Sequence, residues 1–305
     1  MPDPLPVLHI GFNKAGSTTL QNGLFARHPE VASLGEPFKR EHLDVHEAMF
    51  NVMKSCHRDP AQRVEFNLER CRALWQQALA AIGPGKVPVY SKESMVSAAF
   101  YDAPTDARLP TKLRAVVGGA RIVIMARHQI KLLESLYITR NKGHSYRSPD
   151  EWFEENDRGS LYMFRYNAIA ESYAEAFGRE NVGVFLLEDL QADVGAFAKR
   201  LCDFIGIDGD LGARLLAGQK WNTRTSQRMH TYSRLRKRFG PDIRLNRYVP
   251  GSVRDAFVRF IGGGSPAKVE LPSRWVSEMR TYYGEDNRQL AARWGLPLEK
   301  YGYPL

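Results

Sequence analysis

Cysteine is scarce in this 305-residue sequence, and the three cysteines, Cys56, Cys71 and Cys202, are scattered and odd in number. Such a set argues against a disulfide framework and favours a reducing compartment. No apolar run approaches the length that a membrane-spanning helix needs. Met1 is followed almost at once by an apolar segment, so we expect no signal peptide, no membrane span and a cytoplasmic protein.

The sequence contains no zinc-ligand spacing, no helix-turn-helix motif and no RNA-binding motif, which weighs against nucleic acid as a partner. Internal repeats and low-complexity tracts are also missing, and 43% hydrophobic and 25% charged residues are typical of a globular protein. Lysine and arginine total 43 against 34 aspartate and glutamate, a formal net charge of +9. This excess favours anionic partners, such as a cofactor with several phosphates or an acidic glycan. The oligomeric state is left open.

The beginning of the chain predicts an anion site. An apolar run over Val7–Ile10 predicts a buried strand, and Ser17-Thr18-Thr19 open a helix after a loop framed by Gly11 and Gly16. Free backbone N–H groups and the helix dipole converge in such a loop. The glycine spacing matches the start of a Walker A loop, but serine stands at position 17 and the lysine is Lys14. This exchange disfavours a nucleotide triphosphatase and favours another phosphate ester, with a ligand-free strand-to-helix turn as the alternative.

Strand and helix signals alternate along the chain, which predicts an α/β fold with a three-layer parallel sheet flanked by helices. We expect a single domain over residues 1–305. Residues 219–270 begin with a strongly basic stretch and form a candidate lid or insert over an anionic ligand, with a solvated helical face as the alternative. The expected strands are 7–10, 87–90, 121–127 and one more buried strand within 178–190, with a short extended segment within 28–38. The expected helices include 41–55, 60–82, 149–156, 160–177, 191–205 and 273–294.

Polar side chains that follow the predicted strands are further candidates, because ligand groups come from the carboxyl ends of parallel strands. Lys92 follows the strand at 87–90 and is placed to meet an anion, unless it is an exposed loop lysine. Arg127 ends the strand at 121–127, and Ser135 lies eight residues on; both side chains can bind a phosphate. An edge salt bridge is the alternative for Arg127. Glu36 lies in a Gly-Glu-Pro turn, and composition alone favours a solvated glutamate there.

Residues 13–20 resemble K-x-G-[ST]-[ST]-x-L, the 5′-phosphosulfate loop of sulfotransferases that use PAPS, 3′-phosphoadenosine 5′-phosphosulfate. Arg127 and Ser135 resemble the 3′-phosphate motif of that family, R-x7-S. The Gly-Glu-Pro-Phe turn with Glu36 and the Ser-Lys-Glu-Ser segment with Lys92 resemble motifs of glycan O-sulfotransferases of the heparan-sulfate type. Residues 177–206 and 282–304 are similar to stretches that are common in bacterial sulfotransferases.

The resemblance implies transfer of a sulfuryl group from PAPS to a hydroxyl or amino group, of a carbohydrate by preference, through in-line displacement. Glu36 would be the general base, Lys14 would stabilise the leaving oxygen, and Lys92 would steady the sulfuryl oxygens. PAP would be the product, and relatives of this kind use no metal in the transfer. The cofactor-binding set would be Lys14, Ala15, Gly16, Ser17, Thr18, Thr19, Arg127, Ser135 and Arg224.

Two departures from the family pattern bear on these roles. The 3′-phosphate motif usually continues Arg-Asp-Pro and carries a second arginine, whereas this chain continues with His128-Gln129 and has Leu132 at the second position. Sulfotransferases for phenols and steroids place a histidine base where this chain has Ser94, which favours Glu36 and a glycan-like acceptor.

Three alternatives remain open. The first is a sulfotransferase that acts on a small-molecule alcohol or phenol. The second is a P-loop kinase, which would need a lysine at position 17 and an acidic strand end. The third is a non-catalytic PAP-binding protein, which we would expect to have lost Lys14 or the base.

Overall fold

The computed structural model describes residues 4–36, 40–96, 107–140, 147–155, 163–217, 226–239, 260, 263–265 and 267–305. The chain divides into two compact units. The first comprises Met1–Gln129, Arg158–Lys220 and Arg280–Leu305, and the second comprises Ile130–Asp157 and Trp221–Met279. Most of the candidate basic lid at 219–270 belongs to the second unit, and much of it lies outside the described residues. The expectation of a single domain stays a prediction.

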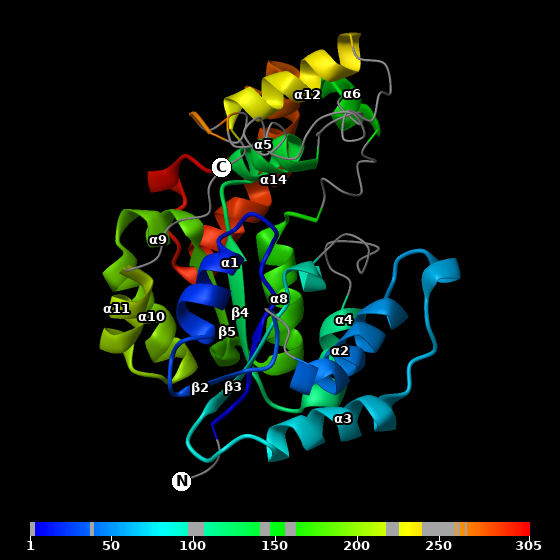
Figure 1. Ribbon diagram of the computed structural model, residues 1–305, viewed down its shortest axis with the longest axis vertical. Helices are drawn as coiled ribbons and strands as arrows, with labels where there is room; N and C mark the ends of the chain where they lie inside the picture. The colour runs from blue at the N-terminus through cyan, green and yellow to red at the C-terminus, as the bar shows by residue number, and fades with distance from the viewer. Residues whose placement is uncertain are drawn as a thin grey trace. The chain divides into compact units, whose positions relative to one another are not determined.

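One parallel sheet forms the centre of the first unit, and among the described residues it has five strands in the order β2-β3-β1-β4-β5 (Figure 1). The central strand, β1, is fully buried and pairs with β3 on one side and β4 on the other. The order of the strands changes direction at β1, so the loops after β1, β3 and β4 leave the sheet at a topological switch point, where ligands bind in open α/β sheets. The strands are β1 (Val7–His9), β2 (Val31–Ser33), β3 (Val87–Ser91), β4 (Arg121–Ala126) and β5 (Val182–Leu186).

Helices cover both faces of this sheet. The α-helices of the two units together are α1 (Ser17–Thr19), α2 (Leu43–Ser55), α3 (Leu68–Ala80), α4 (Arg108–Val117), α5 (Gln129–Arg140), α6 (Pro149–Glu155), α8 (Tyr166–Phe177), α9 (Leu187–Ala192), α10 (Val194–Ile205), α11 (Gly209–Ala217), α12 (Gln227–Phe239) and α14 (Ser273–Trp294). A π-helix, η1 (Leu20–Phe25), continues α1, and short 3-10 turns are η2 (Arg40–His42), η3 (Pro60–Gln62), η4 (Glu93–Val96), η7 (Arg179–Asn181) and η9 (Glu299–Tyr301).

The layers of the first unit follow from the helix packing. On one face, α11 packs against α10 and against η1. On the other face, α8 contacts β4 and β5, α4 packs against α8, and α2 and α3 pack against α4 (Figure 1). This arrangement confirms the three-layer α/β fold with a parallel sheet that the alternating pattern predicts.

The strands predicted at 7–10, 87–90 and 121–127 are each confirmed to within one residue, the strand predicted within 178–190 is β5, and the helix at 273–294 matches α14. Three helices begin later than expected: α8 begins at Tyr166 instead of near residue 160, and polar side chains determine where the other two begin. Asn67 accepts a hydrogen bond from the Arg70 N–H at 2.9 Å, so α3 begins at Leu68 instead of near residue 60. Asp193 caps α10 in the same way and separates it from α9.

The second unit has an aromatic core. Phe153 stacks on Trp275 with ring centroids 5.0 Å apart, and Tyr137 meets Trp152 edge to face at 5.7 Å. The indole N–H of Trp275 donates a hydrogen bond to Asp150 Oδ1 at 2.8 Å. Large rings bury much apolar surface per residue, so these contacts hold together the parts of α5, α6 and α14 that belong to this unit.

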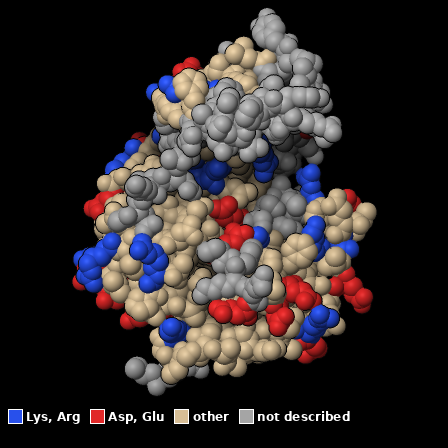
Figure 2. Space-filling model, in the orientation of Figure 1, with Lys and Arg blue, Asp and Glu red and all other residues tan. Residues whose placement is uncertain are grey.

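Charged side chains are interspersed on the molecular surface. On the face drawn in Figure 2, acidic and basic side chains lie side by side over α10, α11 and the region of α3. The net charge of +9 is therefore not gathered there, among the described residues, into one basic surface of the kind that binds nucleic acid. Within the described ranges, the structure contains no helix that is both long enough and apolar enough to span a membrane.

A buried carboxylate begins α8. Asp286 is 2% exposed, and its oxygens accept hydrogen bonds from the N–H groups of Asn167 at 2.9 Å and Ala168 at 3.1 Å. We predict that Asp286→Ala lowers the free energy of unfolding by about 1–3 kcal/mol, because two buried N–H groups lose their acceptor. Denaturant unfolding measures the loss. Asp193→Ala is the matched control, since Asp193 caps α10 at the surface and its loss costs about 1 kcal/mol or less. Equal losses in the two variants would contradict the assignment.

Candidate functional site

The site lies in the first unit, at the carboxyl edge of the sheet, where the chain leaves β1, β2, β3 and β4. The loop after β1 contains Lys14, and Glu36 follows β2. Lys92 comes directly after β3, and Arg127 directly after β4. Parallel strands end at the same edge, so four segments that are far apart in the sequence each contribute a charged residue to that edge.

The loop after β1 has the backbone of an anion-binding turn. Lys14 adopts a left-handed φ of 67°, which is uncommon for a residue with a side chain, and Gly16 has a φ of 93°. Such alternation of backbone conformation turns successive N–H groups toward one point. In the described structure the N–H groups of Gly16, Ser17 and Thr18 have no hydrogen-bond acceptor. The loop therefore offers three backbone donors at a helix N-terminus and fits a phosphate or sulfate ester.

Two other loop residues use their N–H groups inside the turn. The Ala15 N–H donates to the Phe12 carbonyl at 3.2 Å, and the Thr19 N–H donates to the Gly16 carbonyl at 3.0 Å. Ala15 is fully buried, so its side chain faces the protein interior. The Ser17 hydroxyl, also buried, lies 3.5 Å from the Phe12 carbonyl that accepts its hydrogen bond.

Arg127 braces this loop from β4. Its Nη1 donates a hydrogen bond to the Lys14 carbonyl at 2.9 Å, which helps to hold the left-handed turn. The Arg127 carbonyl in turn accepts a hydrogen bond from the Tyr166 hydroxyl at 2.7 Å. Ser135 belongs to the second unit, on α5, where its carbonyl accepts a hydrogen bond from Thr139. Arg224 lies outside the described residues, so the roles predicted for Ser135 and Arg224 stay predictions.

Glu36 and Lys92 meet through the backbone ladder of the sheet. Beyond β2, the Glu36 N–H still donates to the Ser91 carbonyl at 2.9 Å, so the segment continues alongside β3. The Lys92 N–H donates to the His9 carbonyl of β1 at 3.0 Å. Lys92 Nζ then donates to Glu36 Oε1 at 2.5 Å. The lysine side chain is 18% exposed and the glutamate side chain 27%, so the ion pair is shielded from solvent but can still be reached from it.

Three polar side chains behind Glu36 are buried, and sequence reasoning misses them. Gln21 Nε2 donates to Glu36 Oε2 at 3.3 Å and to Ser91 Oγ at 3.0 Å. Ser91 Oγ lies 2.7 Å from Nδ1 of His9. Burial lowers the pKa of His9 to about 3, so the imidazole is neutral at physiological pH. A histidine inside the apolar run of β1 is the one signal in the sequence that could have pointed to this network.

A second carboxylate, Glu93, lies next to Lys92 in the sequence and close to the loop. Burial raises the pKa of Glu93, and the negative charge of Glu36 raises it further. Lys14, a hydrogen bond with Ser17 and the charge of Lys92 act in the opposite direction. Glu93 is therefore a rival to Glu36 as a proton acceptor, and its position beside Lys92 in the Ser-Lys-Glu-Ser segment was the available signal.

His46, on α2, is a third titratable group near Glu36. Its Nδ1 lies 3.2 Å from the hydroxyl of the buried Tyr90. Burial lowers the pKa of His46, Lys92 lowers it further, and the negative charge of Glu36 opposes both effects. No motif in the sequence marks His46, because α2 reaches the site through packing alone.

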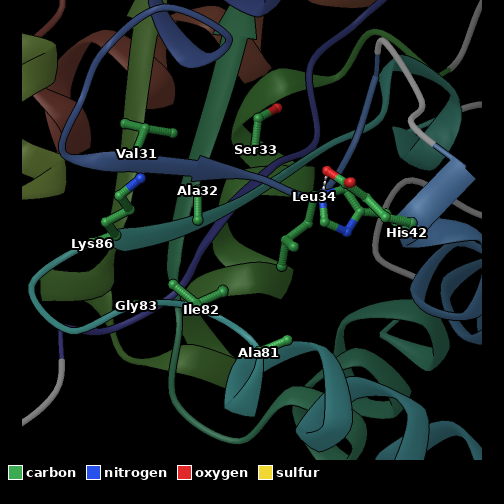
Figure 3. A pocket seen from close by; sticks show the side chains of 10 residues that line it. Val31, Ala32, Ser33, Leu34, His42, Ala81, Ile82, Gly83 and Lys86 are labelled. Atoms are coloured by element: carbon green, nitrogen blue, oxygen red, sulfur yellow. Dashed lines mark ion pairs between the residues drawn. The ribbon is translucent and has the colours of Figure 1, made fainter.

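A separate hollow lies along β2, at the edge of the sheet. It has a volume of about 230 Å³ and is lined by Ala32, Leu34 and Ile82, with the Glu41–His42 ion pair near it (Figure 3). Its lining includes none of the loop residues, so it is distinct from the anion site. Groups of three or more His, Cys, Asp or Glu that could hold a metal ion are missing from the described part of the chain.

Comparison with protein families gives one match. A model described as the sulfotransferase family matches residues 6–210 of this chain. The matched stretch contains all five strands of the sheet, the loop with Lys14, and Glu36, Lys92 and Arg127. No curated protein matches the sequence.

Solved sulfotransferase structures resemble the chain at low sequence identity. A sulfotransferase from Alicyclobacillus acidocaldarius is 15% identical, with 99% of each chain covered and a TM-score of 0.56, which shows a shared fold. Mouse sulfotransferase SULT7A1 in complex with PAP is 13% identical, with 98% of this chain and 88% of that chain covered and a TM-score of 0.46. The sulfotransferase domain of the Synechococcus PCC 7002 olefin synthase is 13% identical, with 92% and 96% covered and a TM-score of 0.40.

Glycine is required at position 35 because two backbones approach closely there. A Cβ on Gly35 would lie 2.2 Å from the Ser91 nitrogen and 2.4 Å from the Ser91 oxygen. We predict that Gly35→Ala lowers the free energy of unfolding by about 1–3 kcal/mol, since the chain before Glu36 must move away from β3. Gly83→Ala is the matched control, because nothing lies within 4 Å of a Cβ there. Thermal unfolding of both variants tests this, and a Gly35→Ala midpoint as high as that of the control would refute it.

Proposed function

This chain belongs to the sulfotransferase family, as the match over residues 6–210 shows, and on that premise we propose that the enzyme transfers a sulfuryl group from PAPS to an acceptor hydroxyl or amino group, with Glu36 as general base. The observation that supports this most is the placement of an anion-binding loop and a Glu36–Lys92 pair at one edge of one sheet.

The cofactor side of the proposal rests on the loop after β1. PAPS would supply the sulfuryl group and a phosphate leaving group. The N–H groups of Gly16, Ser17 and Thr18 hold the 5′-phosphate, because they are the donors that the turn leaves without an acceptor. Lys14, an exposed side chain on the same loop, neutralises the negative charge that develops on the leaving oxygen. Arg127 keeps the loop in shape and is our candidate for the 3′-phosphate.

The acceptor side rests on the pair after β2 and β3. Glu36 takes the proton from the acceptor as the new bond to sulfur forms. Lys92 holds the Glu36 carboxylate at 2.5 Å and carries the positive charge that suits the sulfuryl oxygens. Positioning and electrostatics supply most of the acceleration in such a site, as they do in phosphoryl transfer.

We propose a carbohydrate hydroxyl as the acceptor. A glutamate base in a Gly-Glu-Pro-Phe turn and a serine at position 94, where phenol-sulfating enzymes carry histidine, support this choice. A small alcohol or phenol is the alternative. A panel of glycans, phenols and amino alcohols, each supplied with PAPS, separates the two classes: turnover confined to phenols would refute the carbohydrate proposal.

Binding of PAP tests the cofactor assignment. PAP carries phosphate at two positions and AMP at one, so we predict that PAP raises the melting temperature clearly more than AMP or ATP at equal concentration. At a concentration 100-fold above its dissociation constant, a ligand stabilises the folded state by about 2.7 kcal/mol. Arg127→Ala should remove most of the difference between PAP and AMP. Arg121→Ala, at the opposite end of the same strand, is the matched control.

Equal shifts with PAP and AMP in the wild-type protein would refute the assignment of Arg127 to a second phosphate. Addition of EDTA should leave sulfuryl transfer intact. Magnesium-dependent turnover of ATP, without transfer from PAPS, would instead support the kinase alternative.

The role of Glu36 is tested by single-turnover kinetics. Glu36→Gln keeps the shape and polarity of the side chain but cannot accept a proton, so we predict a loss of about 10²–10⁴-fold in rate. PAP binding should stay near that of the wild type, because the loop is unchanged. Glu93→Gln is the informative comparison, since Glu93 is the rival carboxylate. A wild-type rate for Glu36→Gln together with a collapsed rate for Glu93→Gln would reassign the base.

A further inference from the structure

A chain of hydrogen bonds runs from the middle of the sheet to the Glu36 carboxylate. It joins His9 to Ser91 at 2.7 Å, Ser91 to Gln21 at 3.0 Å, and Gln21 to Glu36 Oε2 at 3.3 Å. Gln21 is 5% exposed, and Ser91 and His9 are fully buried. Glu36 is thus held at both oxygens, by Gln21 on one and by Lys92 on the other.

The directions of the two Gln21 hydrogen bonds follow from the donors that are present. The Gln21 amide must turn its NH₂ toward Glu36, because its carbonyl oxygen would repel the carboxylate. The second N–H of that NH₂ then donates to Ser91 Oγ. Ser91 Oγ also shares a hydrogen bond with His9 Nδ1 at 2.7 Å, and the tautomer of the neutral imidazole decides which of the two atoms donates. The Gln21 NH₂ group therefore donates in two directions, to the Glu36 carboxylate and to the buried Ser91 hydroxyl.

The backbone around Gln21 is unusual in a way that serves this contact. Gln21 lies in the first turn of the π-helix η1, where the Ala26 N–H donates to the Gln21 carbonyl at 3.0 Å, five residues away. A π-turn is wider than an α-turn, and such turns are frequent at functional sites. The side chain of Gln21 is therefore directed inward from the helix that begins at the anion loop, and one helix serves both halves of the site.

We propose that Gln21 is a positioning residue for the transfer reaction: its amide, oriented by Ser91 and His9, holds the Glu36 carboxylate aimed at the acceptor. This inference rests on the proposed role of Glu36 as base. Lys92 alone would leave one carboxylate oxygen without a protein donor in the described structure, and the carboxylate could rotate about its own axis. A second donor with a fixed direction removes that freedom, and a donor to the ionised form also favours that form.

Other groups act on the Glu36 carboxylate and must be included in any test by pH. Lys92 contacts it directly, Glu93 repels it from η4, and His46 and the buried Tyr90 interact with it from α2 and β3. All of these groups are unchanged in a Gln21 variant. A shift of the pH profile in that variant therefore reports the loss of the Gln21 amide.

The test is the pH dependence of kcat in two variants of position 21. Gln21→Met keeps an unbranched side chain of similar length without a donor, and we expect kcat to fall about tenfold. Its acid limb should move up by about half to one pH unit. Gln21→Glu places a second carboxylate against Glu36, so the limb should move further in the same direction. The KM for PAPS and the rise in melting temperature with PAP should change little in both.

Gln62→Met is the matched control. Gln62 also donates to a carboxylate, Asp59 Oδ2 at 2.9 Å, but the pair is exposed and lies on η3, so its loss should leave the pH profile unchanged. Ser91→Ala releases the other side of the Gln21 amide and should shift the limb in the same direction by a smaller amount. A role in folding alone would lower the melting temperature without moving the limb.

The outcomes separate the two proposals. If Glu36→Gln loses turnover while Gln21→Met and Gln21→Glu keep the wild-type acid limb, Glu36 is the base and the role of Gln21 is wrong. If Glu36→Gln keeps wild-type turnover, the base is misassigned and the inference about Gln21 falls with it. A shifted limb in both Gln21 variants, with a folded protein that still binds PAP, supports the inference.

Discussion

The parallel pairing of β2, β3 and β1 is the constraint on which the site depends. The backbone hydrogen bonding continues just past the strand ends. The Glu36 N–H, beyond β2, donates to the Ser91 carbonyl of β3, and the Lys92 N–H, beyond β3, donates to the His9 carbonyl of β1. The sheet backbone therefore fixes the spacing of Glu36 and Lys92, so that their side chains can form an ion pair. Backbone ladders are rigid compared with loops, so a site built on them can hold reacting groups closely enough for catalysis. Gly35 belongs to the same constraint, because only a residue without Cβ lets the chain before Glu36 lie against β3.

Electrostatics then divides the roles of the two carboxylates. The negative charge of Glu36 raises the pKa of Glu93, because a nearby like charge disfavours the ionised form. Burial is the largest cause of the raised pKa of Glu93. Glu36 instead receives donors at both oxygens, from Lys92 and Gln21, and donors of that kind stabilise a carboxylate. In enzyme sites with two carboxyl groups, such differences in environment commonly give the two groups different chemical roles.

The sequence predicts the scaffold well and the interior of the site poorly. Apolar runs between turn residues are enough to locate β1, β3, β4 and β5, and glycine spacing with Lys14 is enough to locate the anion loop, because both depend on residues that are neighbours in the chain. Gln21, Ser91 and His9 were missed for the opposite reason: their contacts span 15 to 82 positions, and each residue by itself looks like an ordinary member of its helix or strand. The predicted helix starts differ from the observed ones where a single capping side chain determines the first residue, as Asn67 does for α3 and Asp193 for α10.

The division between local and distant contacts also matters for what the enzyme recognises. A loop that binds phosphate through backbone N–H groups depends on its shape, and many sequences can form it, so the loop carries the part of the site that addresses the cofactor. Glu36, the base that we propose, is held by a network of side chains drawn from β1, η1 and β3. Because η1 continues directly from α1, a single helical segment joins the anion loop to Gln21, and the Gln21 amide contacts Glu36.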